Sequence, residues 1–301
     1  MSRKRNWQVA AAATLVVVLV ATVVTPVTAA RPGELPDLAV LVSGHDPVPV
    51  KSVTVHCPQA GQSVFGAGGR IIDGAGAVAL TAIAPDQTLS SVTVEAAARN
   101  GHTADWSVEA IAVCDVSSDP PHRQASTTVD GATAAASCPD PTRVTGTGFR
   151  FDGAVAAHLD EVTPDQDLRR VRVHVGGTTP ARVTAYAICK RPTSVDGTPG
   201  VRRSATTGTD ATWPKTVTVG AAGSDQRVYG VGASVRGRGA MLTALVPHPV
   251  LNLAGARADQ VPRPDQPTWD DPGARRYDAS DDGSDDGELT GYAILLSPTF
   301  H

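Results

Sequence analysis

Four cysteines are the residues of this 301-residue chain with the most definite chemistry. They are Cys57, Cys114, Cys138 and Cys189. No pair has the Cys-x-x-Cys spacing, and no group of cysteines and histidines has the spacing of a zinc site. An even number of cysteines favours disulfide bonds in an exported chain, and counting alone leaves three pairings open.

An acidic stretch near the C-terminal end has oxygen-bearing side chains at the alternating spacing of a calcium loop. Asp278, Asp282 and Asp286 lie in "DASDDGSDDGE", where a glycine also allows the required turn. The position of the closing glutamate is taken by Leu289, and Glu288 falls one residue short. A solvated acidic loop is therefore the favoured interpretation, with weak calcium binding as the alternative. No resident metal or cofactor is predicted.

A basic face is expected on the segment "RRVRVHV". Arg170, Arg172 and His174 alternate with valines, so a strand would present all three side chains on one side. Such a face suits an anionic glycan or cell-wall polymer. The solvated side of a half-buried strand has the same alternation, and this simpler interpretation is favoured.

The three tryptophans outside the N-terminal segment are candidates for sugar contacts, because an exposed aromatic ring offers an apolar face and a polar handle. Trp106 opens a strand-like segment and is expected in the core. Trp213 lies in a polar segment, and Trp269 lies in an acidic, proline-rich stretch where exposure is expected. Aromatic residues make up only 4% of the chain, which is few for a glycan-binding protein.

A glycine-rich stretch at Gly66, Gly68 and Gly69 has some likeness to a phosphate-binding loop. It lacks the following Gly-Lys-Ser/Thr and the change from strand to helix that such loops need. A structural cause is favoured, namely a β-bulge or a tight turn that needs positive φ.

Motifs that indicate catalysis are missing from the sequence. It contains no Gly-x-Ser-x-Gly, no His-Glu-x-x-His and no Ser-x-x-Lys. The eight histidines are scattered and do not recur at equivalent places. We therefore predict no enzymatic activity, with an extracellular hydrolase of unrecognised site as an alternative.

The N-terminal segment has the order of a secretory signal peptide. Residues 3–5 are basic, residues 9–24 are apolar, and Pro26 precedes the small residues Ala29 and Ala30. Cleavage there is predicted, and an uncleaved membrane anchor is the alternative. Cleavage leaves 23 Lys and Arg against 30 Asp and Glu, a net charge of −7. This charge argues against a general nucleic-acid binder or a protein held on anionic membranes after cleavage.

Three internal repeats account for most of the remaining sequence. "SVTVHCPQAGQSVFGAG" at 52–68 aligns without a gap with "TVTVGAAGSDQRVYGVG" at 216–232, and "SCPDPTRVTGTG" at 137–148 is a middle copy. The motif Pro-Asp-Gln-x-Leu occurs at 85–89 and again at 164–168. The copies end in similar segments, which are "WSVEAIAVC" (106–114), "ARVTAYAIC" (181–189) and "ELTGYAIL" (288–295).

The third copy lacks both of its cysteines, which are replaced by Ala221 and Leu295. A joint loss is expected of a bonded pair, because one remaining thiol would be reactive in an oxidising space. This predicts one bridge from Cys57 to Cys114 and one from Cys138 to Cys189. Each bridge is expected to join the first and last strands of its repeat. In the third repeat, Ala221 and Leu295 are expected to pack together as a small apolar pair in place of the bridge.

Alternating apolar residues and frequent Gly, Pro and Asp predict an all-β protein with about five short antiparallel strands per repeat. We expect three sandwich-like repeats packed together, with a pseudo-threefold axis as one arrangement, because modules of this size are marginally stable alone; independent modules are the alternative. The expected division is a signal peptide (1–29), a proline-rich lead that adds an edge strand or stays unstructured (30–50), repeat 1 (51–116), a linker (117–131), repeat 2 (132–192), a linker (193–213), and repeat 3 (214–299) with an acidic insertion (261–288).

The pattern Cys-Pro … Val-x-Gly-x-Gly … Tyr-Ala-Ile-Cys resembles a secreted repeat of high-GC actinobacteria whose function is unknown. The resemblance covers about residues 50–299 and implies export and fold, with no catalytic residues. The expected function is an exported, non-enzymatic interaction or structural module at or outside the cell surface. A cell-wall polysaccharide-binding module is the first alternative, and the partner, a glycan or a surface protein, stays open.

Overall fold

The computed structural model describes residues 36–74, 76–99, 101–152, 157–177, 182–192, 200–223, 226–260 and 286–296. Within these ranges the chain forms strands and no helix, which confirms the all-β prediction. Repeat 1 contains β1 (Asp37–Val42), β2 (Val50–His56), β3 (Gln62–Ile72), β4 (Val78–Pro85), β5 (Ser91–Ala98) and β6 (Ser107–Val116). Repeat 2 contains β7 (His122–Val129), β8 (Thr133–Ser137), β9 (Arg143–Asp152), β10 (His158–Pro164), β11 (Arg170–Gly176) and β12 (Arg182–Lys190). Repeat 3 contains β13 (Val201–Thr206), β14 (Lys215–Gly220), β15 (Arg227–Arg236), β16 (Ala240–His248), β17 (Leu253–Gln260) and β18 (Glu288–Leu296).

Each repeat therefore has six strands, one more than expected. The additional strands are β1, which lies in the proline-rich lead, and β7 and β13, which lie in the two segments interpreted as linkers. The linker interpretation is corrected for these residues. β7 and β13 are polar because each is an edge strand with solvent on one side, so their apolar alternation is weak.

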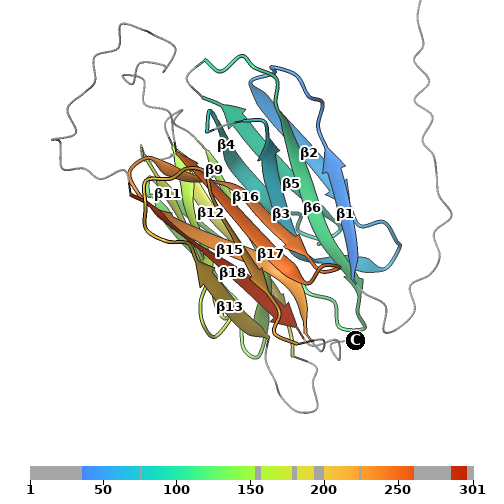
Figure 1. Ribbon diagram of the computed structural model, residues 1–301. Helices are drawn as coiled ribbons and strands as arrows, with labels where there is room; N and C mark the ends of the chain where they lie inside the picture. The colour runs from blue at the N-terminus through green and yellow to red at the C-terminus, as the bar shows by residue number, and fades with distance from the viewer. Residues whose placement is uncertain are drawn as a thin grey trace, which may run out of the picture.

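The strands form three antiparallel sheets of six strands, and every sheet combines halves of two repeats (Figure 1). Sheet A has the order β1-β6-β3-β16-β17-β14, sheet B has β2-β5-β4-β9-β12-β7, and sheet C has β13-β18-β15-β10-β11-β8. In each sheet the third strand of one repeat meets the fourth strand of another. We call this meeting line a seam.

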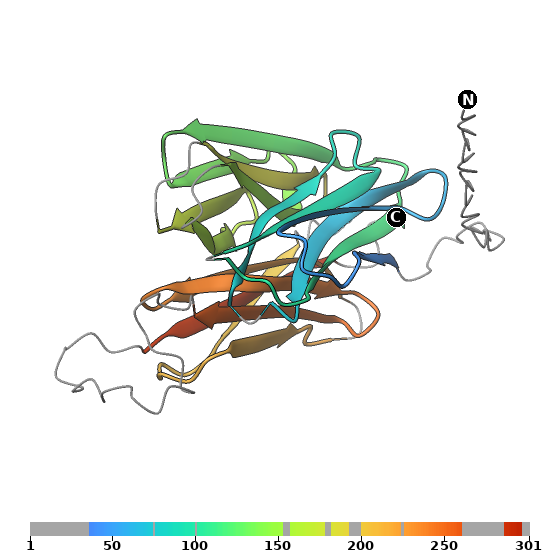
Figure 2. The same ribbon diagram turned by 90° about the horizontal axis from the view of Figure 1, so that it is seen from above.

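The three seams have the same register. The pairs are Gly69 with Leu245, Phe149 with Ile83, and Ala233 with Val162. Each repeat is thus a small sandwich whose two halves continue into its neighbours, and the view from above shows the three repeats gathered into one body (Figure 2). The prediction of packed repeats with pseudo-threefold symmetry is confirmed.

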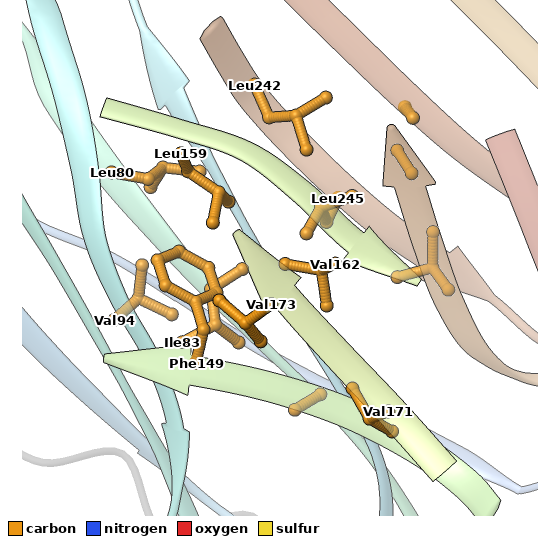
Figure 3. Packing of buried hydrophobic residues seen from close by; sticks show 14 of the residues in the cluster. Leu80, Ile83, Val94, Phe149, Leu159, Val162, Val171, Val173, Leu242 and Leu245 are labelled. Carbon is orange, nitrogen blue, oxygen red and sulfur yellow. The ribbon is translucent and has the colours of Figure 1, made fainter. Parts of the chain in front are cut away.

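A shared hydrophobic core joins the repeats. Figure 3 shows side chains from β4, β5, β9, β10, β11 and β16 meeting in one cluster. Among them, Ile83 of repeat 1 and Phe149 of repeat 2 are at most 1% exposed, as is Leu159. Because independent modules would each close their own core, this shared packing explains how repeat 3 folds without a disulfide bond.

Glycines bring the repeats close together around the pseudo-threefold axis. A Cβ added at Gly66 would lie 1.8 Å from the carbonyl oxygen of Tyr229. The two equivalent glycines meet the remaining repeats in the same way. A Cβ added at Gly146 would lie 2.6 Å from the carbonyl oxygen of Phe65, and one added at Gly230 would lie 2.4 Å from that of Thr145. The glycine two residues further along each third strand faces the fourth strand of a neighbouring repeat. An added Cβ would lie 2.5 Å from the carbonyl oxygen of Leu245 at Gly68, 2.5 Å from that of Ile83 at Gly148, and 2.6 Å from that of Val162 at Gly232.

These glycines have a structural role, as predicted, but positive φ is not its cause. A β-bulge does precede Gly66, where the register shifts between Val64 and Gly66. Neither Gly66 nor Gly68 has positive φ. Glycine is needed there because backbone from another repeat occupies the place of a side chain.

Two disulfide bonds join the two sheets of a repeat sandwich. Cys57 is bonded to Cys114 and Cys138 to Cys189, the pairing that the joint loss predicts. Each bond links the end of the second strand to the last strand, not the first to the last, because every repeat has the additional edge strand. Chain-entropy arguments give each bond roughly 4 kcal/mol. In repeat 3, Leu295 is fully buried and packs in the same core as Ala221.

Candidate functional site

The free edge of sheet A departs from the threefold pattern. β1 ends this sheet, and among the described strands it pairs only with β6. Val40, Leu41 and Val42 are 45%, 48% and 45% exposed. We call residues 38–42 the apolar edge. Proteins usually protect a free edge with charge or proline, so an apolar one indicates a contact surface.

β1, β7 and β13 are structurally equivalent, because each pairs in the same register with the last strand of its repeat. The pairs are Val40 with Ile111, Ala125 with Tyr186, and Ser204 with Tyr292. Both Ala125 and Ser204 are exposed, as Val40 is. The three positions are therefore all exposed and can be compared by their side chains.

In repeats 2 and 3 an arginine of the edge strand packs over the ring of a tyrosine on the last strand. In repeat 2 the guanidinium of Arg123 lies 5.0 Å from the ring centre of Tyr186, and its Nη1 donates to the carbonyl of Pro85 at 3.0 Å. Repeat 3 has the same arrangement, with Arg202 at 4.8 Å from Tyr292 and at 3.1 Å from the carbonyl of Pro164. Charge on these two edges discourages pairing with another strand.

Repeat 1 has aliphatic residues in place of this arginine–tyrosine pair. Leu38 stands where the arginines stand, and Ile111 stands where the tyrosines stand. Val40 and Val42 continue the same face, while Leu41 lies on the opposite face of the strand. Among these three equivalent edges of the described chain, that of repeat 1 alone is apolar, and this difference makes it the candidate contact site.

A small polar cavity lies at the seam between repeats 1 and 3, with a volume of about 180 Å³. It is lined by Ile71, Asp73, Gly74, Gly76, Val78, Thr243, Arg257 and Asp259. Asp259 accepts hydrogen bonds from Thr243 Oγ1 at 2.5 Å and from Arg257 Nη2 at 3.1 Å. Since ligand pockets usually measure about 300–1,000 Å³, this cavity suits water or a small group, and the carboxylate of Asp259 already has partners.

An asymmetric polar cluster lies beside the glycine contacts. Tyr229 donates to Asp115 Oδ2 at 2.7 Å, and burial, followed by the nearby charge of Asp115, raises the pKa of Tyr229 well above its usual range. Lys190 donates to Ser117 Oγ at 2.9 Å and to the carbonyl of Asp119 at 2.8 Å. Burial lowers the pKa of Lys190, and the carboxylates of Asp119 and Asp115 oppose this shift. Every one of these groups has a partner within the fold, so the cluster fixes the repeats to one another.

Two buried lysines hold the loops that enter the second strands, and the sequence reasoning missed them. Lys51 Nζ lies 2.7 Å from Asp46 Oδ1 and donates to the carbonyls of Gly44 at 2.7 Å and Trp106 at 2.6 Å. In repeat 3, Lys215 Nζ lies 2.8 Å from Asp210 Oδ1 and 3.4 Å from the carbonyl of Gly208. Hydrogen bonds from the lysine and a backbone amide lower the pKa of each aspartate. The signal was the pattern Gly-x-Asp-x-x-x-x-Lys, which occurs at 44–51 and 208–215.

The Pro-Asp-Gln-x-Leu motif is a structural turn. Asp86 Oδ1 accepts from the backbone amides of Ser90 at 2.7 Å and Ser91 at 2.9 Å. Leu89 has a φ of 56° and is buried, and its carbonyl accepts from Val64. The second copy has the same bonds, with Asp165 accepting from the amides of residues 169 and 170, and Leu168 at a φ of 53°.

The basic face lies on β11, as the alternation predicted. Arg170 and Arg172 are exposed, and the intervening valines are buried. Arg172 Nε lies 3.8 Å from Glu161, and His174 Nδ1 lies 2.7 Å from Asp160 Oδ1. Carboxylates on β10 therefore offset part of the positive charge of this face.

The remaining candidates are three tryptophans and three acidic residues. Trp106 is fully buried, as expected, with Lys51 Nζ 4.8 Å from its ring centre. Trp213 is half-buried against the core. Trp269, Asp278 and Asp282 lie outside the described residues, and Asp286 is exposed. Elsewhere in the described ranges, no three acidic, histidine or cysteine side chains gather as a metal site requires.

Comparison with known proteins adds no family. A scan against models of protein families and a search of curated proteins both found no match. In the part of the chain that the structure describes, no helix has the length and apolarity of a membrane span. The resemblance to the secreted actinobacterial repeat stays a prediction.

Proposed function

We propose that this chain is an exported, non-enzymatic interaction module whose contact surface is the apolar edge at residues 38–42. The observation that carries the proposal is the contrast between three equivalent edges. Two carry arginine at the position of Leu38, and the third exposes Val40 and Val42 instead. Because an exposed apolar edge is prone to unwanted strand pairing, its presence favours a role in binding a partner.

The proposed compartment is the cell surface or the extracellular space. The two disulfide bonds are compatible with an oxidising compartment. The N-terminal order of basic, apolar and small residues supports a cleaved signal, with an uncleaved anchor as the alternative. The resemblance to a secreted actinobacterial repeat supports the same proposal.

Site-specific photo-crosslinking in cells tests this function. A photoreactive amino acid is placed at Val42 of the exported protein, and the matched control carries it at Thr206, the equivalent exposed residue of β13. We expect a discrete crosslinked species from position 42 and none from position 206. Equal crosslinking from both positions, or none from position 42, would remove the apolar edge as the contact surface.

A polysaccharide-binding module is the second candidate, favoured by the exposure of Arg170 and Arg172 on the outer face of sheet C. Two guanidinium groups on one flat face suit a polyanionic wall polymer. The carboxylates of Asp160 and Glu161 beside this face weaken that case. Binding to such a polymer would fall steeply with salt, whereas contact through the apolar edge would not.

A further inference from the structure

The apolar edge presents backbone groups as well as apolar side chains. Ser43 donates its amide to the carbonyl of Val108 on β6 at 2.9 Å. Because amides and carbonyls alternate in direction along an antiparallel strand, those of Leu38, Val40 and Val42 point away from β6, toward the free edge. No other strand of the described chain pairs with them. These three residues form a template for one more antiparallel strand.

We propose that the strand that binds there is β1 of a second copy of this chain, so that two copies of sheet A join across a twofold axis. The inference rests on the proposed function and names its partner.

β1 is complementary to its own antiparallel copy. An alignment centred on Val40 places Val40 opposite Val40 of the second copy and Leu38 opposite Val42. All these residues direct their backbone groups to the free edge, so each pair exchanges both N–H···O bonds. On the other face of the sheet, Ala39 falls opposite Leu41. Apolar side chains then meet on both faces, and exposed Val40, Leu41 and Val42 become covered.

Charge also favours this pairing. Residues 38–42 contain no charged side chain, and in the centred alignment Asp37 falls opposite Ser43. No like charges therefore oppose each other. β13 contains Arg202 and Arg203, so its pairing with a second β13 would bring four arginines together.

Twofold pairing through β1 also stops at two copies. An isologous contact uses the same surface on both partners, so pairing consumes both apolar edges. The opposite edge of sheet A is β14, whose exposed side chains are Thr216 and Thr218. An interface of one strand per copy is small, and we expect a weak dimer in the micromolar range.

Sedimentation velocity over a concentration series of the exported protein tests the proposal. We expect the wild-type mass to rise twofold with concentration. Val40→Lys places two like charges directly opposite each other and should weaken the dimer about tenfold or more. The matched control Ser204→Lys makes the same change at the equivalent exposed position of β13 and should leave the dimer intact. Near-ultraviolet circular dichroism checks that each variant keeps its fold.

A second variant separates strand pairing from simple apolar contact. In Val40→Pro the amide that faces the free edge is lost, while the bonds from β1 to β6 stay. Strand pairing predicts that this variant also weakens the dimer. A wild-type protein that stays monomeric, a dimer insensitive to Val40→Lys, or one insensitive to Val40→Pro overturns the proposal. If the monomer still gives a crosslink from position 42 to another molecule, the second copy is wrong and the proposed function stands.

Discussion

Replacing Gly66 by alanine tests the contact that holds the three repeats together. The added methyl group would lie 1.8 Å from the carbonyl oxygen of Tyr229 and 2.8 Å from its carbonyl carbon. Both are backbone atoms of another repeat, so no side chain can rotate away. Relief requires the third strands of repeats 1 and 3 to move apart at the axis.

The cost follows from the known range for overpacked cores. Overpacking typically costs about 1–3 kcal/mol, and a backbone obstacle belongs at or above the upper end of that range. For a protein of this size, about 3 kcal/mol corresponds to a decrease in Tm of roughly 6–12 °C. The equivalent Gly146→Ala and Gly230→Ala meet oxygens at 2.6 and 2.4 Å. They should cost less than Gly66→Ala, with Gly230→Ala the more severe of the two.

Thermal unfolding with intact disulfides measures these shifts, and Gly255→Ala is the matched control. Gly255 lies in β17 without positive φ, and the nearest atom to an added Cβ is 4.0 Å away. The control should be neutral or stabilising by about 0.4–1 kcal/mol, since alanine restricts the unfolded chain. Hydrogen exchange gives a second measure, because Gly66→Ala should also reduce protection in β15 of repeat 3. A Gly66→Ala protein as stable as the control, or one with protection lost in repeat 1 alone, would refute the close packing of the repeats.

Three further predictions concern the disulfides, the turns and the basic face. Replacing Cys138 and Cys189 by the alanine and leucine of the third repeat should lower stability by about 2–4 kcal/mol, and by less than replacing both with alanine; urea unfolding measures the difference. Burial alone would raise the pKa of Asp86, but the hydrogen bonds from Thr88, Ser91 and Ser90 together outweigh it and lower the pKa. The stabilising effect of Asp86 should therefore be present above about pH 4 and be lost as pH falls through the folded value; an Asp86→Asn protein should show a smaller loss of Tm on acidification. Replacing Arg170 and Arg172 by serine should abolish any salt-sensitive co-sedimentation with cell-wall polymer, and unchanged sedimentation would dismiss the basic face.

Features local to one repeat were predictable from the sequence. The alternation in "RRVRVHV" placed the valines of β11 inside and the arginines outside, because a strand directs successive side chains to opposite faces. The joint replacement of two cysteines by Ala221 and Leu295 gave the disulfide pairing, because bonded residues change together. Trp106 was correctly expected in the core.

Features that depend on neighbours at an edge were only partly predictable. The sequence predicts linkers where β7 and β13 lie, since a strand with one solvated side and polar residues has little alternation to detect. The paired pattern of Lys51 and Lys215 was visible in the sequence, yet it had no meaning until the carbonyls around each lysine were known.

The sequence by itself determined the all-β class, the inner strands of each repeat, the threefold repetition and the covalent pairing, because these follow from side-chain alternation and from comparison of the copies. Only the tertiary structure decided how the halves of the repeats combine into shared sheets. It also decided why Gly66 must be glycine, since the carbonyl it faces is more than 150 residues away in the chain. The apolar edge emerged in the same way. "LAVLV" becomes unusual only when register aligns it with the arginine-bearing edges of β7 and β13, because exposure and edge position are properties of the assembled sheets.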